Sequence, residues 1–354
     1  MSLRARSLAL LALLVGLLAL VAAGCGDDDE EGGGASSGGS SEEQTYKVGV
    51  SNTLVGNGWR EEMICAVKAQ SLASGQVDEV LVHNVNGDAS AQIAGIRNLI
   101  SSGANAIIIN PADREALNPV IKEADARGIV VVAVDQAVTA PEAYVVTNDQ
   151  VAYGRLGAEW LAEQLGGEGN IVEMRGISGV PADDDRHEGF TEVIEANPGM
   201  KVVKETFTDW SFAPAGKQAN DILNSNTQVD AIWTSGIDYV VVDALKKAGQ
   251  DDVPVIGTDN NKFLEQLQDG APGAAVTNPA TIGGVGTAIA LQALDGENPE
   301  KVTTLTPEVW DMENSADTIE EFYDPELPPT YSTQMIIEPY TTYTQEQLTG
   351  CEGP

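Results

Sequence analysis

Two residues stand where a ligand could meet the edge of a predicted sheet. Asp135 directly follows the run 129–134 (IVVVAV), which is apolar at every position and so typical of a parallel strand covered by helices on both faces. Open α/β sheets bind ligands at the carboxyl ends of such strands, where a carboxylate accepts hydrogen bonds. Trp59 ends the loop 52–58 at the same edge, and its flat ring could stack on a pyranose or furanose ring. The alternatives are a turn or helix-capping role for Asp135 and core packing for Trp59.

Repeated helix and strand patterns position these residues. Two amphipathic segments, 89–102 and 114–127, each precede a short apolar run, at 106–109 and 129–134. Gly103 and Gly128 follow the helices, where a left-handed residue often ends the last turn. Strands are also predicted at 46–51 and 79–82, with a helix at 59–74 between them. The pattern continues through helices 151–164, 183–195, 213–223 and 239–248, strands 170–174, 200–208, 230–234 and 254–257, and a short helix near Phe263.

Length and charge limit the possible functions. A chain of 354 residues is long enough for two domains with their own cores. The formal net charge of −35 repels phosphate backbones and argues against nucleic-acid binding.

The first 44 residues predict secretion and attachment. Residues 1–24 have a basic start, an apolar core from Leu8 to Val21 and small residues at the end, as in a signal peptide. The sequence AAGC, ending at Cys25, resembles a bacterial lipobox, which implies that Cys25 carries lipid; secretion without lipid is the alternative. Residues 25–44 are acidic and rich in glycine and serine, so we expect a flexible tether rather than a cation site.

The remaining cysteines form a candidate pair. If Cys25 is lipidated, Cys65 and Cys351 are left in an oxidising compartment, where we expect a disulfide between the first helix and the C-terminal tail. Two unpaired thiols are the alternative.

No catalytic constellation is evident. No Gly-x-Ser-x-Gly elbow lies between a predicted strand and a helix, and Ser211 stands where a phosphate loop ending at Gly216-Lys217 needs glycine. The two histidines are not at metal-ligand spacing. We therefore expect no enzyme activity, no cofactor and no metal.

The order of these elements, together with the phrases GWREEM, QIAGIRNLISSGANAIIINPAD and GIVVVAVD, resembles the sugar-binding proteins of ABC importers in the type I periplasmic-binding-protein superfamily, closest to the ribose and galactofuranose binders. The resemblance covers about residues 46–305. It implies two doubly wound parallel-sheet α/β lobes joined by three crossings, at 145–149, at Asn278-Pro279 and after Asp295. The implied N-terminal lobe is 45–147 plus 281–300, the C-terminal lobe is 148–280 plus about 301–310, and 311–354 is a tail wrapping the surface.

The resemblance also implies a ligand site between the lobes. Arg186, in the phrase RHEGF, would fork onto ligand hydroxyls, or else neutralise the three aspartates before it. Asp259 in GTDN would accept hydrogen bonds from the ligand, and Trp210 would be a second aromatic, with Phe212 competing for that place. Asn278 would be a hinge-side amide, or else a turn residue before Pro279. The ligand-contact set expected from the resemblance and the strand ends is Asn57, Trp59, Asp135, Gln136, Arg186, Trp210, Asp238, Asp259 and Asn278.

The resemblance implies a monomeric, lipid-anchored solute-binding protein on the outer face of the cytoplasmic membrane. It would capture a monosaccharide-sized sugar between its lobes and deliver it to an ABC permease. The alternatives are a ligand-sensing receptor lipoprotein and a binder of a non-sugar molecule such as a nucleoside or an autoinducer.

Overall fold

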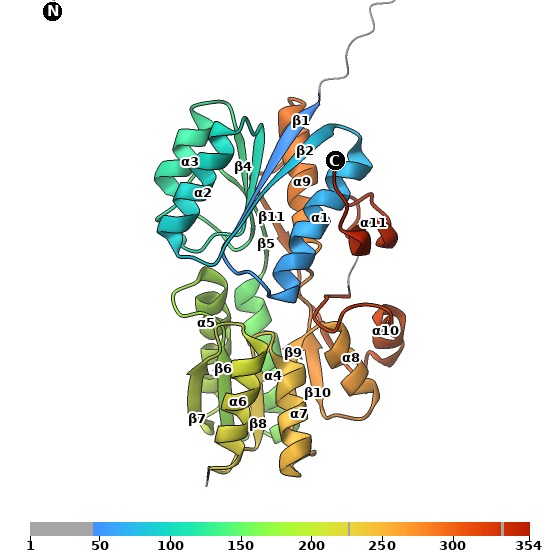
Figure 1. Cartoon of the computed structure of the whole chain (residues 1–354). Coiled ribbons are helices and arrows are strands. Elements are labelled where there is room, and N and C mark those ends of the chain that lie inside the picture. Colours follow the sequence, from blue (N-terminus) through green and yellow to red (C-terminus); the bar gives the residue numbers. More distant parts are fainter. Residues whose placement is uncertain (1–44, 226, 334–335) are drawn as a thin grey trace, which may run out of the picture. The chain divides into compact units, whose positions relative to one another are not determined.

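The computed structural model describes residues 45–225, 227–333 and 336–354, so the predicted signal peptide, tether and Cys25 lie outside the described residues. The segment Glu43–Pro354 forms one compact unit, and its strands lie in two six-stranded sheets (Figure 1). We call the part built on the first sheet lobe 1 and the part built on the second sheet lobe 2.

The sheet of lobe 1 is parallel throughout, as continuous apolar strands predict. Its strands, in spatial order, are β11 (Val302–Leu305), β5 (Tyr144–Asn148), β4 (Val130–Asp135), β3 (Ala106–Ile109), β1 (Tyr46–Asn52) and β2 (Val77–Asn84).

Helices cover both faces of this sheet. Alternate residues of β3 divide between two cores, with Ile108 packed on one side and Ile107 and Ile109 on the other. The helices of lobe 1 are α1 (Gly58–Ser74) and α9 (Ile282–Leu294) on one face and α2 (Ala89–Ser101) and α3 (Asn118–Asp125) on the other. Gly103 and Gly128 have positive φ angles of 84° and 75° after the second pair of helices, as predicted.

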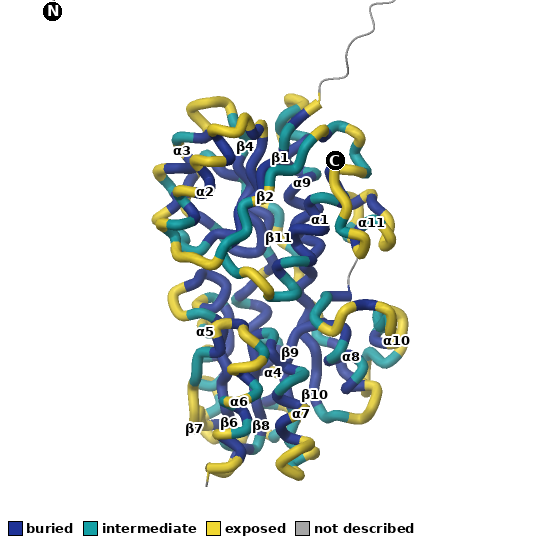
Figure 2. Tube along the Cα trace, viewed as in Figure 1, coloured by how far each residue is buried: buried dark blue, intermediate teal, exposed yellow. Residues whose placement is uncertain are grey.

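Lobe 2 repeats this architecture, with one antiparallel edge strand. Its strands, in spatial order, are β12 (Val309–Asp311), β10 (Gly273–Val276), β9 (Val255–Thr258), β8 (Ala231–Thr234), β6 (Glu168–Arg175) and β7 (Gly199–Phe207). Its helices are α4 (Gln150–Leu165), α5 (Pro181–Ala196), α6 (Phe212–Leu223), α7 (Asp238–Ala248), α8 (Asn261–Gln268) and α10 (Ala316–Phe322). In both lobes the central strands are buried, whereas the edge strands β7 and β11 are largely exposed or half-buried (Figure 2). The chain therefore has the two-lobed, doubly wound fold that the sequence predicted.

One predicted domain boundary is wrong. Residues 301–310 were assigned to the C-terminal lobe, but Val302–Leu305 pairs in parallel with β5 and extends the sheet of lobe 1. Only Val309–Asp311 joins lobe 2, where it pairs antiparallel with β10. The third crossing therefore lies at residues 306–308, because two short edge strands belong to different sheets.

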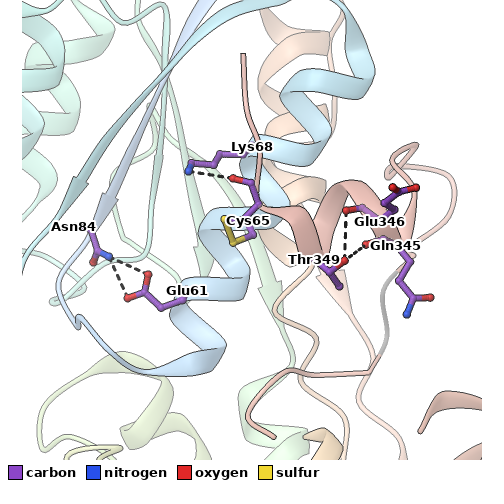
Figure 3. The surroundings of a disulfide bond; sticks show 8 residues. Glu61, Cys65, Lys68, Asn84, Gln345, Glu346 and Thr349 are labelled. Carbon is purple, nitrogen blue, oxygen red and sulfur yellow. Dashed lines mark hydrogen bonds between the residues drawn. A yellow bond between two sulfur atoms is a disulfide. The ribbon is translucent and has the colours of Figure 1, made fainter. Parts of the chain in front are cut away.

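The tail is not only an extended wrap. It contains α10 in lobe 2 and α11 (Gln345–Gly350), and Cys351 forms a disulfide with Cys65 of α1 (Figure 3). The Lys68 ammonium also donates to the carbonyl oxygen of Cys351 at 3.3 Å. The predicted pairing is present, and it fixes the end of the tail to lobe 1.

Between these two helices the tail contacts both lobes. The Ser332 amide donates at 2.7 Å to Glu62 of α1, and Ser332 also forms a β-bridge with Asn260 of lobe 2. The Glu62 side chain is fully buried, and this burial raises its pKa well above the usual range for glutamate. The tail is thus a fourth connection between the lobes.

Candidate functional site

A cavity with about 420 Å³ of empty space, part of it open to solvent, lies between the two lobes. Its walls come from the start of α1 and from segments that follow the carboxyl ends of β4, β6, β7, β8, β9 and β10, where open α/β sheets bind ligands. The lining residues are Asn57, Trp59, Arg60, Asp135, Arg186, Trp210, Ser235, Gly236, Thr258 and Asn278.

Asp135 is held in a left-handed backbone conformation, with φ of 68°, which is uncommon for a residue with a side chain. Its carbonyl oxygen accepts hydrogen bonds from Thr147 Oγ1 at 2.9 Å and from Gln150 Nε2 at 3.1 Å. Gln150 Nε2 also donates to the Asp135 carboxylate at 2.8 Å. These contacts hold the carboxylate toward the cavity, where it can accept hydrogen bonds from a ligand.

Arg186 faces Asp135 from lobe 2. Its Nε donates to Gln150 Oε1 at 2.7 Å, one Nη donates to Ser235 Oγ at 3.2 Å, and the guanidinium carbon lies 4.1 Å from the centre of the Tyr153 ring. Within the described part of the chain, no carboxylate lies within 4.0 Å of its nitrogens. Its position is fixed by polar and aromatic contacts, and the guanidinium keeps donors for a ligand.

Arg60 is a lining residue that the sequence analysis missed. It is buried, and one Nη donates to Asn52 Oδ1 at 3.2 Å. Burial lowers its pKa to about 10, Asp135 opposes this shift, and Arg186 adds to it. The available signal was its place at the start of the first helix, three residues after the helix cap Asn57.

Two tryptophans line the cavity, one from each lobe, and each ring is oriented by its N–H group. Trp59 Nε1 donates to the Asn278 carbonyl oxygen at 2.6 Å, and Trp210 Nε1 donates to the Ser235 carbonyl oxygen at 2.7 Å. Trp210 also has a left-handed backbone, with φ of 47°. The rings therefore present fixed apolar surfaces.

Asn57 and Asn278 connect the walls. Asn57 Nδ2 of lobe 1 donates at 3.1 Å to the carbonyl oxygen of Trp210 in lobe 2. Asn278 Oδ1 accepts from Asn148 at 3.0 Å and from Gln150 at 3.3 Å, so it lies among the chain crossings.

Three predicted site residues, Gln136, Asp238 and Asp259, do not line the cavity. Gln136 is buried between the lobes, where it binds Asn110 and the amide of Ala182. Asp238 accepts from the Thr258 amide at 2.7 Å, from the Tyr239 amide at 2.8 Å and from Asn260, so its carboxylate is used at the start of α7. In both cases nearby protein donors and acceptors occupy the polar groups.

Asp259 lies directly behind the lining residues Thr258 and Asn278. Its Oδ1 accepts from the Asn278 amide at 2.8 Å and from Thr258 Oγ1 at 3.1 Å, while Oδ2 is buried without a hydrogen-bond partner. Burial raises the pKa of both Asp259 and Asp238 to about 6, against the hydrogen bonds that favour ionisation. Asp259 therefore places a buried carboxyl group with one unpaired oxygen behind the cavity.

Comparison with known proteins decides the family. The model of the Periplasmic binding protein domain family matches residues 48–298. The chain belongs to this family. It is a member of the type I periplasmic-binding-protein superfamily, of the kind that serves sugar ABC transporters. Residues 299–354, which hold β11, β12 and the disulfide-linked tail, lie beyond the match.

The curated relatives of this periplasmic binding protein include sugar and polyol binders. The chain is 30% identical over 250 residues to the xylitol-binding protein of Mycolicibacterium smegmatis, covering 68% of this chain and 66% of the relative, just under two thirds. It is 25% identical to the ribose import binding protein of Bacillus subtilis, covering 72% of this chain and 84% of the relative.

Solved structures give the same fold. An ABC transporter solute binding protein from Thermobispora bispora is 28% identical, with a TM-score of 0.75, covering 81% of this chain and 90% of that chain. The binding protein of the arabinose ABC transporter from Shewanella sp. ANA-3, bound to α- and β-L-arabinofuranose, is 25% identical, with a TM-score of 0.71, covering 78% and 95%.

Two further features are absent from the residues that the structure describes. No group of three or more His, Cys, Asp or Glu side chains there could hold a metal ion. None of the helices in 45–225, 227–333 and 336–354 combines the length and the apolar character needed to span a bilayer.

Proposed function

We propose that this periplasmic binding protein captures a neutral monosaccharide or a similarly sized polyol in the cavity between its lobes and delivers it to an ABC permease. The observation that carries the proposal is that Asp135 of lobe 1 and Arg186 of lobe 2 line one cavity. A ligand held by both residues bridges the lobes and stabilises the closed arrangement by binding it more tightly than an open one.

The charges around the cavity favour a neutral ligand. Two guanidinium groups, Arg60 and Arg186, line it together with the carboxylate of Asp135. Asp259, behind Thr258, supplies a second carboxyl group, whose pKa burial raises to about 6. Balanced donors and acceptors suit hydroxyl groups, and the faces of Trp59 and Trp210 suit a ring or a carbon chain.

The relatives support the same ligand class. Their names specify xylitol, ribose and arabinofuranose, all small neutral molecules rich in hydroxyl groups. We infer from this shared chemistry that the present chain binds a member of this class, and from the family that it works outside the cytoplasm. Its role is capture and release rather than catalysis.

We further propose that Cys25, in the sequence AAGC, carries a lipid that holds the protein on the outer face of the membrane. Replacing it, Cys25→Ser, is expected to move the protein from the membrane fraction to the soluble fraction. A mature parent protein whose mass shows no acyl chains contradicts the anchor.

The experiment that tests the ligand is a melting-shift panel of pentoses, hexoses, polyols, nucleosides and amino acids. A hundredfold excess of ligand over its dissociation constant adds about 2.7 kcal/mol to the free energy of unfolding, which is readily seen. We expect sugars or polyols of one class to respond, and Arg186→Ala to abolish the response. Arg155→Ala is the matched control, since Arg155 is half exposed on α4 and, among the described residues, pairs with Glu159 and Glu192. A response confined to nucleosides or amino acids contradicts the proposal.

A further inference from the structure

The helix that carries Arg186 lacks a cap from its own lobe. The residue before α5, Val180, makes no side-chain capping bond, and Pro181 has no N–H group. The amides of Asp183 and Asp184 both donate to the Val180 carbonyl oxygen, at 3.0 and 3.1 Å. Ala182 is therefore the first-turn donor that needs a partner from elsewhere.

That partner comes from lobe 1. The Ala182 amide donates to Gln136 Oε1 at 3.1 Å, and the Gln136 side chain is only 1% exposed. A side-chain oxygen on a first-turn amide is how helix caps act, here supplied across the gap between two lobes. Gln136 thus caps α5 from the opposite lobe.

The orientation of this cap is linked to the ligand cavity. Gln136 Nε2 donates to Asn110 Oδ1, which leaves the Gln136 oxygen facing α5. The Asn110 amide in turn lies 3.5 Å from the carboxylate of Asp135, a lining residue. Gln136 is therefore positioned by the same polar network that holds the Asp135 carboxylate.

A second contact holds the same end of α5. Arg114 of lobe 1 forms an ion pair with Asp185 at 2.6 Å, and both side chains are partly exposed. Exposed pairs are weak and are screened by salt, so this contact contributes less than a buried one. Together, the two contacts fix the start of α5 at Ala182, one helical turn before Arg186, and at Asp185, directly before it.

We propose that Gln136 and Arg114 form an interlobe latch, which holds α5 against lobe 1 when the lobes are closed and so keeps Arg186 in the cavity. The inference rests on the proposed function, because a closed form is needed only if ligand is bound between the lobes. It makes Gln136 a positioning residue that sets ligand affinity without touching the ligand.

The test compares Gln136→Leu, which keeps the size of the side chain and removes both polar groups, with Asp185→Asn. The matched control is Asp221→Asn, which breaks an ion pair of 2.6 Å to Lys217 inside α6 and joins no lobes. For the sugar that shifts the melting temperature, we expect Gln136→Leu to raise the dissociation rate and the dissociation constant roughly five- to tenfold, as loss of one buried hydrogen bond implies. The association rate and the melting temperature without sugar should stay close to the parent values, since each lobe keeps its own core.

Asp185→Asn should weaken sugar binding less than Gln136→Leu does. In 1 M salt, the affinity of Asp185→Asn should equal that of the parent, whereas the loss of affinity in Gln136→Leu should persist. Unchanged affinity in both variants overturns the latch. Loss of binding as complete as that of Arg186→Ala also overturns it, because Gln136 would then be a ligand contact. If the control Asp221→Asn loses as much sugar affinity as Gln136→Leu, the latch is also overturned.

A second measurement does not depend on the sugar. Spin labels on Ser101→Cys of α2 and Lys247→Cys of α7, both exposed positions on different lobes, report the distance between the lobes. Without sugar, Gln136→Leu should reduce the fraction of molecules whose labels are at the shorter distance, which corresponds to closed lobes. An unchanged distribution of label distances contradicts the latch. Failure of every sugar to bind the parent protein refutes the proposed function alone, because the label distances still test the latch.

Discussion

Asp135 and Trp210 both have left-handed backbones and both line the same cavity. Such conformations cost roughly 1–3 kcal/mol and persist where the surroundings hold them. For Asp135 the surroundings are the side chains of Thr147 and Gln150, which bind its carbonyl oxygen. Local strain is thus concentrated where the carboxylate and the ring must be aimed at a ligand.

Gly176 tests the placement of the Trp210 ring. A Cβ atom on Gly176 would lie 2.1 Å from Trp210 Cε2, closer than real contacts allow. Gly176→Ala should therefore displace the ring and weaken sugar binding at least tenfold, measured by calorimetric titration. Gly216→Ala is the control, because its Cβ would meet Val240 at an ordinary 3.5 Å. Equal affinities in the two variants would show that the ring does not contact the ligand.

Asp259 gives a prediction of pH dependence. Its pKa is raised from 3.8 to about 6 by burial, so the folded protein holds this proton more tightly than the unfolded chain. The stabilisation by this proton is complete below about pH 4 and is lost as the pH rises through about 6. The side chain of Asp259→Asn cannot ionise, so the variant does not lose stability as the pH rises. Its Oδ1 can still accept hydrogen bonds from Asn278 and Thr258.

The Asn variant should therefore be more stable than the parent at pH 7.5, by roughly 1–3 kcal/mol. The difference in the free energy of unfolding between the variant and the parent should shrink toward pH 4, as measured by denaturant unfolding at several pH values. A gap that does not change with pH means that Asp259 is not the group that titrates.

The sequence allowed some of these residues to be placed and not others. Asp135 was predicted from the end of an apolar strand, and the structure places it in the cavity wall. Arg60 was missed, because a cationic residue in the first turn of an amphipathic helix usually faces solvent. Gln136 was predicted as a ligand contact, but one position further along the loop its side chain points to α5 rather than the cavity. The orientation of the Gln136 side chain depends on its contact with lobe 2, which a local sequence pattern cannot show.

At the scale of elements, the helices and the strands with apolar runs were predicted well, and three short strands without such runs were not. The helix predicted at 59–74 is observed at Gly58–Ser74. The strands β10, β11 and β12 were missed, since each has only three or four residues and the first is built from glycine, alanine and one valine. Short strands without an apolar run are defined by their neighbours in the sheet, not by their own pattern.

The disulfide between α1 and the end of α11 is the element-scale contact with the clearest energetic consequence. It closes a loop with a sequence separation of 286 residues. Replacing both cysteines, Cys65→Ser with Cys351→Ser, should lower the free energy of unfolding by roughly 2–4 kcal/mol, because the unfolded chain gains freedom. Sugar affinity should be unchanged, since neither residue lines the cavity.

Reductant provides the control for this prediction. It should lower the melting temperature of the parent protein and leave that of the double variant unaltered. Equal stability of the parent and the double variant would show that the tail is held by its packing alone.

At the scale of the whole molecule, lobes 1 and 2 have similar sheets and meet at the cavity. Cross-lobe contacts surround this cavity, including Asn57 with Trp210 and Gln136 with Ala182. The repeated βα pattern predicted the individual units, because every unit carries its own periodicity, and the family resemblance implied their division into two lobes. The tail could not be predicted in the same way, since its contacts with Glu62 and Asn260 form between segments far apart in the chain.

The central claim is that a sugar or polyol bridges the lobes between Asp135 and Arg186. The most direct measurement is a crystal structure of the protein with the compound that gives the largest melting shift. We predict density for one molecule in the cavity, with hydroxyl groups within about 3 Å of the Asp135 carboxylate and the Arg186 guanidinium, and with the apolar face of the ligand against Trp59 or Trp210. A ligand bound outside this cavity, or one held by a single lobe, would contradict the account.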